Sequence, residues 1–336
     1  MKFAITAPGE SKFIINQKWL IALKISIAAL LLFVLVRNIQ LQTIREALFK
    51  ADFLFIASAV LLLIPNFFIQ GLKWHYLLKL SKPAATYVEA LKSLLAGFAL
   101  GFVTPGRVGE FGRAIFVKDS NRLQVVGLTM IDKLFSMLII LMLGAFAIFF
   151  FFGIWMHSKL TPVFALVSLA ASLITSLIVL FPDGMKKAGF KILPRLPFTE
   201  KIELILSGLN GFHRNQALFL LALNFLFYAI YLTQFYLLLS AFDVFSPVEG
   251  YIILSSTIFA KSLLPISFGD LGIRESAAVY FVTHIGGEES TAFNASILMF
   301  LINIVLPSLI GFGLVMGEKV NGQLHRKGAD SEVRTR

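Results

Sequence analysis

Residues 105–113 read PGRVGEFGR and residues 265–275 read PISFGDLGIRE, so Pro and Gly interrupt an apolar segment twice in one chain. Fifteen mostly apolar residues precede each break, and before them stand two similar starts, TYVE at 86–89 and SPVE at 246–249. Shifted by 160 residues, the two copies align without a gap on Val, Glu, Pro and both glycines. Five identities in register indicate a duplicated unit.

The residues shared by the two copies predict where each apolar helix breaks. These structural breaks are Pro105, Gly109 and Gly112 in the first copy and Pro265, Gly269 and Gly272 in the second. Inside a bilayer, such a break is tolerated only where the freed backbone groups face protein or a watery cavity. Two interrupted segments in matching positions of two halves are typical of a transporter's binding site.

Each copy also begins with a signal for the start of a helix. Thr86-x-x-Glu89 and Ser246-x-x-Glu249 fit the capping box, in which a hydroxyl and a carboxylate satisfy free backbone N–H groups. Pro247 suits the first helical position, where its missing N–H costs nothing. We therefore expect helices to begin after Thr86 and Ser246, with both glutamates acting as caps.

The composition is that of an integral membrane protein. Hydrophobic residues make up 57% of the chain, charged residues 15%, and the mean hydropathy is +0.83; soluble domains carry about 25% charged residues. The net charge of +11 comes from bases in short loops between apolar segments, which is the positive-inside pattern. We expect no nucleic-acid partner, and the absence of cysteine excludes disulfides and Cys-bound metals.

The pattern predicts an all-α fold with about six full spans and two re-entrant hairpins. The expected spans are 19–36, 53–72, 134–155, 160–181, 217–240 and 293–316, and the hairpins lie within repeats at 86–117 and 246–285. Amphipathic segments at 41–51 and 202–212 are expected at the membrane surface. Together these form one transmembrane domain, 1–317, followed by a polar, disordered tail at 318–336. Asp132 and Lys133 are interpreted as marking the interface before a span.

The distribution of bases favours hairpins that turn back over segments that cross. If both turn back, the cytoplasmic segments are 1–18, 73–92, 105–133, 182–215 and 317–336, and they hold 23 of the 30 Lys and Arg residues. The segments then left outside hold four. The first hairpin enters from the cytoplasm and the second from outside, so the repeat is inverted, as in alternating-access transporters.

The polar residues at the breaks predict an anion site. A helix that resumes after a break presents free N–H groups and a positive dipole, and Arg side chains are forks suited to phosphate. We expect the two breaks to face each other near the midplane, with an anion such as phosphate held there and the arginines paired by carboxylates when no anion is bound. The candidate residues are Arg107, Glu110, Arg113, Lys261, Asp270, Arg274 and Glu275.

Simpler interpretations stay open for several of these residues. Arg113 could be an ordinary cytoplasmic anchor, and Arg274 and Glu275 could pair only with each other or with Asp270. The Pro and Gly positions could mark kinked helices packed by small residues. Asn and Gln within the spans could serve only as hydrogen-bonding groups between helices: Asn224, Gln234, Asn294 and Asn303.

At the two motifs, the chain resembles the flippase-like family, which comprises the transmembrane region of lysylphosphatidylglycerol synthases and their stand-alone relatives. The matching residues are Pro105, Arg107, Gly109, Glu110 and Arg113, then Pro265, Gly269, Gly272, Arg274 and Glu275. The resemblance covers nearly the whole chain. A departure is Asp270, where a small residue is expected, and it could alter headgroup preference or ion coupling. No aminoacyl-transferase domain is expected after Met316.

The resemblance implies translocation of a phospholipid, an aminoacylated phospholipid or a polyprenyl-phosphate-linked lipid. It also implies membrane lipids as partners, with a separate lipid-modifying enzyme as a further one. We expect a prokaryotic cytoplasmic (inner) membrane location, both termini in the cytoplasm, no cofactor and no metal. The alternatives are a secondary transporter of a small anion and an assembly or scaffold protein. No Ser/His, paired Asp or His cluster has spacing usable for catalysis, so enzyme activity is not expected.

The topology can be tested by labelling, because the chain has no native cysteine. In intact cells, Glu288→Cys should react with a membrane-impermeant thiol reagent because residues 283–290 are expected outside. Lys187→Cys should react only after the cells are opened. The reverse pattern would exclude the topology with two hairpins.

Overall fold

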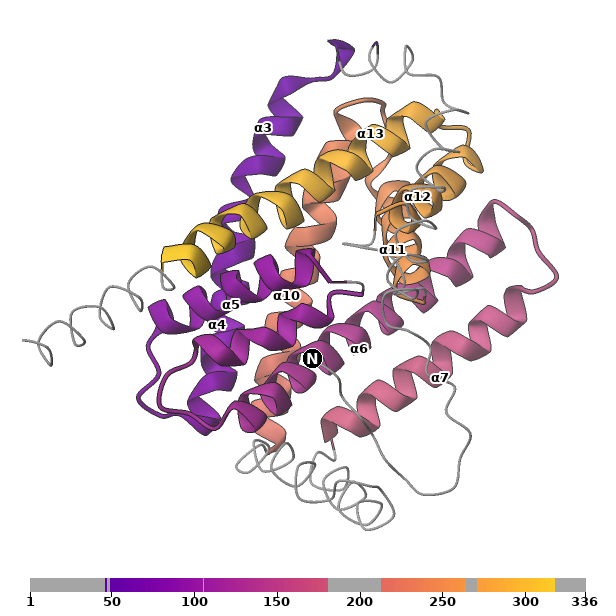
Figure 1. Ribbon diagram of the computed structural model, residues 1–336. Helices are drawn as coiled ribbons and strands as arrows, with labels where there is room; N and C mark the ends of the chain where they lie inside the picture. The colour runs from indigo at the N-terminus through magenta and orange to yellow at the C-terminus, as the bar shows by residue number, and fades with distance from the viewer. Residues whose placement is uncertain (1–45, 47–48, 105, 181–212, 264–270, 318–336) are drawn as a thin grey trace, which may run out of the picture.

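A computed structural model describes residues 46, 49–104, 106–180, 213–263 and 271–317 (Figure 1). These residues form helices joined by turns, and no strand occurs among them. The predicted all-α class is therefore confirmed. The expected first span at 19–36, the amphipathic segment at 202–212, most of that at 41–51, and the tail at 318–336 lie outside the described residues.

The helices follow the order of the sequence prediction, with a 3-10 helix after the first break. In chain order they are α3 (Phe53–Leu61), α4 (Leu63–Ser81), α5 (Tyr87–Phe102), the 3-10 helix η1 (Val108–Phe116), α6 (Arg122–Ile154), α7 (Thr161–Leu180), α10 (Arg214–Ser240), α11 (Pro247–Leu263), α12 (Ile273–Thr283), α13 (Glu289–Phe300) and the π-helical turn η3 (Leu301–Val305).

Four described helices are long and apolar enough to cross a membrane, which makes the protein an integral membrane protein. They are Phe53–Ser81, Arg122–Ile154, Arg214–Ser240 and Glu289–Gly317, and Thr161–Leu177 is a shorter apolar helix. Each overlaps an expected span. A stretch of about 20 apolar residues suffices to cross the hydrocarbon core, so all four exceed the minimum length.

Two of these helices are longer than predicted, and the difference matters for the site. The helix expected to end at residue 72 continues to Ser81, and the one expected to begin at residue 134 begins at Arg122. Lys73, Asp132 and Lys133 therefore lie within helices rather than in the segments between them. The predicted spans were too short because charge was taken as a sign that a span ends. Lys73 and Asp132 are buried and form an ion pair with each other.

The first copy of the repeat turns back on itself. Thr86 caps α5 by accepting a hydrogen bond from the Glu89 N–H, as predicted. The glycines of α5 show the reversal, since Gly97 lies against Arg113 and Gly101 against Glu110. Residue numbers thus rise along α5 while they fall along η1. The two segments run antiparallel in close contact.

The predicted role of Glu89 as a cap is wrong. Its carboxylate lies 2.8 Å from the Lys82 ammonium and accepts the Lys118 N–H at 3.1 Å. It joins the start of α5 to the residues that follow η1, because the Lys82 ammonium and the Lys118 backbone N–H compete successfully with the backbone N–H that a capping box would satisfy.

The second copy begins with the complete capping box. Ser246 accepts from the Glu249 N–H at 3.3 Å, and the Glu249 carboxylate accepts from the Ser246 N–H at 3.2 Å. Pro247 is the first residue of α11, as predicted. This helix packs along α6, where Gly144 leaves room for Phe259, and it also contacts α12. Residues 264–270, which include Pro265, Gly269 and Asp270, lie outside the described residues.

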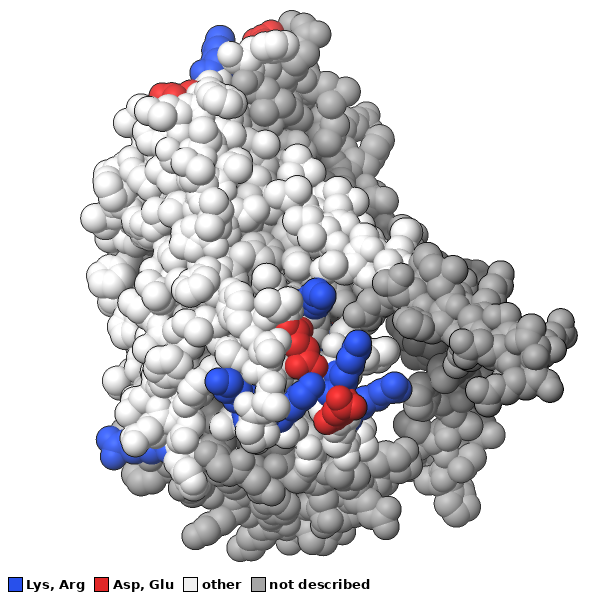
Figure 2. All heavy atoms as spheres, turned by 90° about the vertical axis from the view of Figure 1, so that its left-hand side faces the viewer, with Lys and Arg blue, Asp and Glu red and all other residues white. Residues whose placement is uncertain are grey.

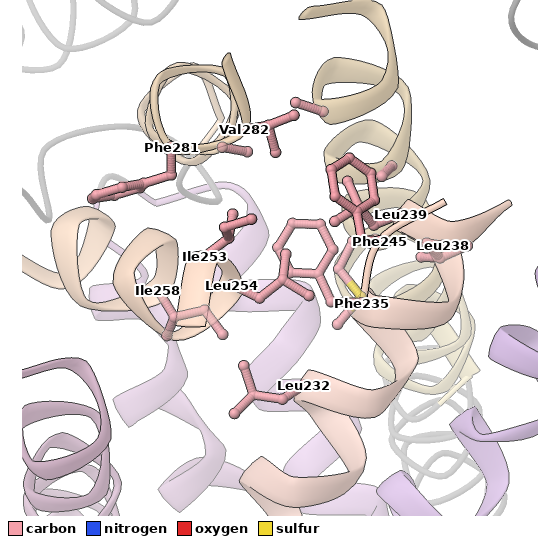
Figure 3. Close-up of a cluster of buried hydrophobic side chains, with 14 of the residues drawn as sticks. Leu232, Phe235, Leu238, Leu239, Phe245, Ile253, Leu254, Ile258, Phe281 and Val282 are labelled. Carbon is pink, nitrogen blue, oxygen red and sulfur yellow. The ribbon is translucent and has the colours of Figure 1, made fainter. Parts of the chain in front are cut away.

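Buried apolar side chains form one cluster around each copy. Figure 3 shows the cluster of the second copy, which includes Phe235 of α10, Ile253 and Leu254 of α11, and Phe281 and Val282 of α12. The first copy has its own cluster, with residues from α4, α5 and α6. The described part of each copy therefore packs into its own cluster of buried apolar residues.

The close contact at Gly109 leads to a stability prediction. A Cβ at this position would lie 2.0 Å from the Leu100 carbonyl oxygen, whereas one at Gly313 would meet nothing within 4 Å. Gly109→Ala should lower the stability of the protein by about 1–3 kcal/mol, the usual cost of overpacking. Gly313→Ala is the matched control and should not. Thermal unfolding in detergent, followed by size-exclusion chromatography, measures both; equal melting temperatures would contradict the contact.

Candidate functional site

A cavity of about 420 Å³ lies where the two copies meet. Its wall is formed by parts of α4, α5, α6, α10 and α11, by η1 and the turn before it, and by η3. The polar wall residues are Gln70, Lys73, Arg107, Glu110, Arg113, Asp132, Lys133, Ser136, Tyr228, Tyr231, Lys261, Ser262 and Asn303. Figure 2 shows basic and acidic side chains gathered together on a face that is otherwise mainly uncharged.

The sequence of η1 explains how its charged residues reach the cavity. Residues 106–114 read GRV-GEF-GRA, a three-residue repeat of glycine, a charged residue and an apolar residue. A 3-10 helix has 3.0 residues per turn, so side chains three apart are eclipsed. Gly109 and Gly112 therefore share the row that lies against Leu100 of α5. Glu110 and Arg113 share the next row, which lines the cavity.

A left-handed turn begins this segment. Gly106 and Arg107 have φ values of 60° and 55°, and Arg107 is the residue before the first turn of η1. A non-glycine residue in this region is uncommon and costs free energy. The turn places the Arg107 side chain one 3-10 turn before Glu110, so the two form an ion pair with a distance of 2.5 Å from Nε to Oε1.

Asp132 of α6 is shared by two buried cations. Its Oδ1 lies 2.8 Å from the Lys73 ammonium, and its Oδ2 lies 3.1 Å from a terminal nitrogen of Arg113. Lys73 also donates to the Asn224 amide oxygen at 3.0 Å, and Arg113 donates to the Thr129 hydroxyl at 2.9 Å. Both cations thus have additional partners, as buried charges require.

Glu110 of η1 is shared in the same way by Arg107 and Lys133. Lys133 lies 2.6 Å from its second carboxylate oxygen. This cluster is more accessible than the first: the exposed fractions of the Lys133 and Arg107 side chains are 35% and 22%, against 6% for Lys73 and 3% for Arg113. The cavity therefore holds a deep cluster at Asp132 and an outer cluster at Glu110.

Aromatic rings support the cations of both clusters. The Arg113 guanidinium lies 3.8 Å from the centre of the Trp74 ring, and the Trp74 indole N–H is held by Ser93. Arg107 lies 5.1 Å from the Phe98 ring. Such cation–π contacts stabilise a charge away from water without neutralising it, so the cations stay available to an anion.

The structure brings together only some of the residues predicted for the site. Arg107, Glu110, Arg113 and Lys261 lie in the cavity wall. Arg274 and Glu275 do not: both side chains are fully buried, and they form an ion pair with each other, while Arg274 also donates to Ser296 of α13 at 2.9 Å. Pro105, Pro265, Gly269 and Asp270 lie outside the described residues. No group of three His, Asp or Glu in the described ranges is placed to hold a metal ion.

The sequence prediction missed three members of the site: Lys73, Asp132 and Lys133. The sequence did contain a signal for these residues, because apolar residues continue on both sides of each of them. Lys73 lies in QGLKWHYLL and the other two in TMIDKLFSM. An ionisable residue within a continuous helix in a membrane is a candidate functional residue.

Amide side chains join the helices behind the cavity. Asn303 lies in the π-helical turn η3 and donates to Gln234 at 2.9 Å, and Gln234 donates to the Ala59 carbonyl at 2.8 Å. The predicted role of these amides in hydrogen bonding between helices is confirmed for Asn224, Gln234 and Asn303. Because Asn303 also lies in the cavity wall, the π-helical turn falls at the site, as such turns frequently do.

Comparison with known proteins gives one match. Residues 20–311 match the model of a family described as the lysylphosphatidylglycerol synthase TM region. No curated protein and no solved structure matches the chain. The matched range contains both copies of the repeat and every residue that lines the cavity.

The cluster around Asp132 predicts a specific pattern of stability. Asp132→Asn leaves Lys73 and Arg113 buried without their counter-charge, and breaking a buried pair in this way costs about 3–5 kcal/mol. The double variant Asp132→Asn, Lys73→Met leaves one such cation and should recover part of the loss. Thermal unfolding of the purified variants measures both. A double variant no more stable than Asp132→Asn would show that Lys73 is not held by this carboxylate.

Proposed function

This chain belongs to the family of the lysylphosphatidylglycerol synthase transmembrane region, and we propose that it moves a phosphate-bearing lipid between the two leaflets of its membrane. The membership itself gives a membrane lipid-related role. What we propose beyond this is that a lipid is translocated, that it bears a phosphate and that it passes through the cavity. The main support is the charge of the cavity between the two copies.

Charge within membrane-spanning helices is the main support. Five cations and two carboxylates line one cavity, and three of the seven belong to helices long enough to cross the membrane: Lys73, Asp132 and Lys133. Such residues are expensive inside a bilayer and mark substrate pathways or ion relays when they occur. Since the cations outnumber the carboxylates, the ligand that fits this wall is an anion.

The wall also changes in polarity along α6, which favours a lipid over a small solute. Asp132 and Lys133 are followed on the cavity side by Ser136, then by Met137 and Ile140. Eight residues of α-helix cover about 12 Å at 1.5 Å per residue, so the charged region gives way to an apolar one within about the length of a lipid headgroup region. An amphipathic ligand fits both ends of this wall, whereas a small anion uses only one.

We propose further that the repeat is inverted and that both breaks are re-entrant, with about six spans around them. The antiparallel contact of α5 and η1, and the presence of Ile258, Lys261 and Ser262 of α11 in the same cavity wall, support this arrangement. Alternating access would then rock one hairpin against the other around the cavity. The location proposed is the cytoplasmic membrane of a prokaryote, with both termini in the cytoplasm.

Transport alone is proposed, without a covalent step. A separate lipid-modifying enzyme is the proposed partner, because a translocated lipid has to be made on one side of the membrane. A secondary transporter of a small anion is the second candidate, favoured only by the outer cluster at Glu110. A scaffold role would leave the buried charges without a use.

Arg107 gives the sharpest test of translocation. Arg107→Gln should abolish movement of a fluorescent anionic phospholipid in proteoliposomes, and Arg107→Lys should reduce it, because Lys keeps the charge but loses the planar fork. Lys159→Gln is the matched control, since Lys159 is an exposed base in the α6–α7 turn. Arg274→Gln should act differently and lower the yield of folded protein, because its partner is a buried carboxylate.

Rates are normalised to the folded protein recovered from size-exclusion chromatography. Full translocation by Arg107→Gln would place the phosphate elsewhere. Transport of radiolabelled phosphate without movement of lipid would favour the small-anion transporter. If neither substrate moves, the scaffold role gains support.

A further inference from the structure

We infer that the cavity selects a headgroup with at least two negative charges, a phosphomonoester or a diphosphate, over a singly charged phosphodiester or an aminoacylated phospholipid. The inference rests on the proposed function and names its substrate class. It comes from the way in which the two carboxylates of the cavity are shared.

Each carboxylate serves two cations, so each cluster keeps one positive charge. Lys73, Arg113 and Asp132 together carry +1, and so do Arg107, Lys133 and Glu110. The sum is +2 before Lys261, which lies in the wall from the α11 side, is considered. Each carboxylate carries one negative charge and has two cationic partners, so one positive charge of each cluster is left for a ligand.

The two clusters differ in depth, which separates their tasks. The outer one is accessible through Lys133 and Arg107, while Lys73 and Arg113 of the deep one are nearly enclosed. A headgroup enters past the first cluster and reaches the second. Two successive phosphates, or one phosphomonoester drawn from the outer cluster to the deep one, match this order.

The charge of the ligand decides which lipids gain from binding. A phosphomonoester carries about −1.5 to −2 at pH 7, which balances both clusters. A phosphodiester carries −1 and leaves the surplus positive charge of one cluster without a counter-charge. An aminoacylated phospholipid brings ammonium groups of its own into a positive wall, where like charges repel. The expected order of affinity is phosphomonoester, then phosphodiester, then aminoacylated lipid.

Competition binding to the full-length protein in a neutral detergent tests this order. The probe is a fluorescent phosphatidic acid, and the competitors are phosphatidic acid, phosphatidylglycerol, lysyl-phosphatidylglycerol and inorganic phosphate. Phosphatidic acid should bind about tenfold or more tightly than phosphatidylglycerol, since it adds a charge-assisted contact. Lysyl-phosphatidylglycerol should be the weakest lipid. Inorganic phosphate should compete far less well than phosphatidic acid.

Variants link this preference to the clusters. Lys133→Gln removes the surplus charge of the outer cluster and should bring the ratio of the two affinities close to one. Lys133→Arg should keep the preference, and so should Lys159→Gln, which removes an equal charge far from the cavity. Lys133 is the most exposed of the four cations, so its variants are expected to fold.

The outcomes separate this inference from the proposed function. Equal affinity for phosphatidic acid and phosphatidylglycerol, or a full preference in Lys133→Gln, overturns the inference. The proposed function then still stands if Arg107→Gln abolishes translocation of phosphatidylglycerol. If inorganic phosphate competes as well as phosphatidic acid, the cavity binds a free anion rather than a lipid. That result would overturn both the inference and the proposed function.

Discussion

Asp132 has to satisfy two buried cations at once, and this requirement fixes how three segments of the chain meet. Lys73 comes from α4, Arg113 from η1, and the carboxylate itself from α6. Removing Asp132 would leave both buried cations without their carboxylate, so the positions of Lys73 and Arg113 depend on it. The cavity exists because this arrangement keeps polar groups between the two apolar cores, which an apolar contact would have closed.

The two copies of the repeat use their charged residues differently. In the first copy, Arg107, Glu110 and Arg113 face the cavity, while in the second, Arg274 and Glu275 are buried against α13. The copies are also out of register here, because Arg113 aligns with Ile273 at a shift of 160 residues and Arg274 with Ala114. The two copies thus have similar helix starts and breaks but different charged residues. The first copy places its charged side chains in the cavity wall, and the second buries Arg274 between helices.

What could be predicted from sequence depends on whether the signal was local. The capping hydroxyls of Thr86 and Ser246, the break after α5 and the main spans are set by local backbone chemistry, and they were predicted. The roles of Lys73 and Asp132 depend on a partner 59 residues away along the chain, so a rule that reads each charge alone placed both at the membrane surface. Glu89 shows the same limit, since Lys82 and Lys118 lie outside the four-residue motif that predicted it to be a cap.

The 3-10 winding of η1 also determines how its length per residue compares with that of α5, against which it packs. Between Gly97 and Gly101, α5 advances four residues, or about 6 Å at 1.5 Å each. Over the same interval, η1 passes from Arg113 to Glu110, three residues at about 2.0 Å each, which is again about 6 Å. Three residues of η1 therefore cover the same length as four residues of α5, because the rise per residue is larger in a 3-10 helix than in an α-helix. An α-helical η1 would lose this match within one turn, so the 3-10 winding preserves both the contact of Gly97 with Arg113 and that of Gly101 with Glu110.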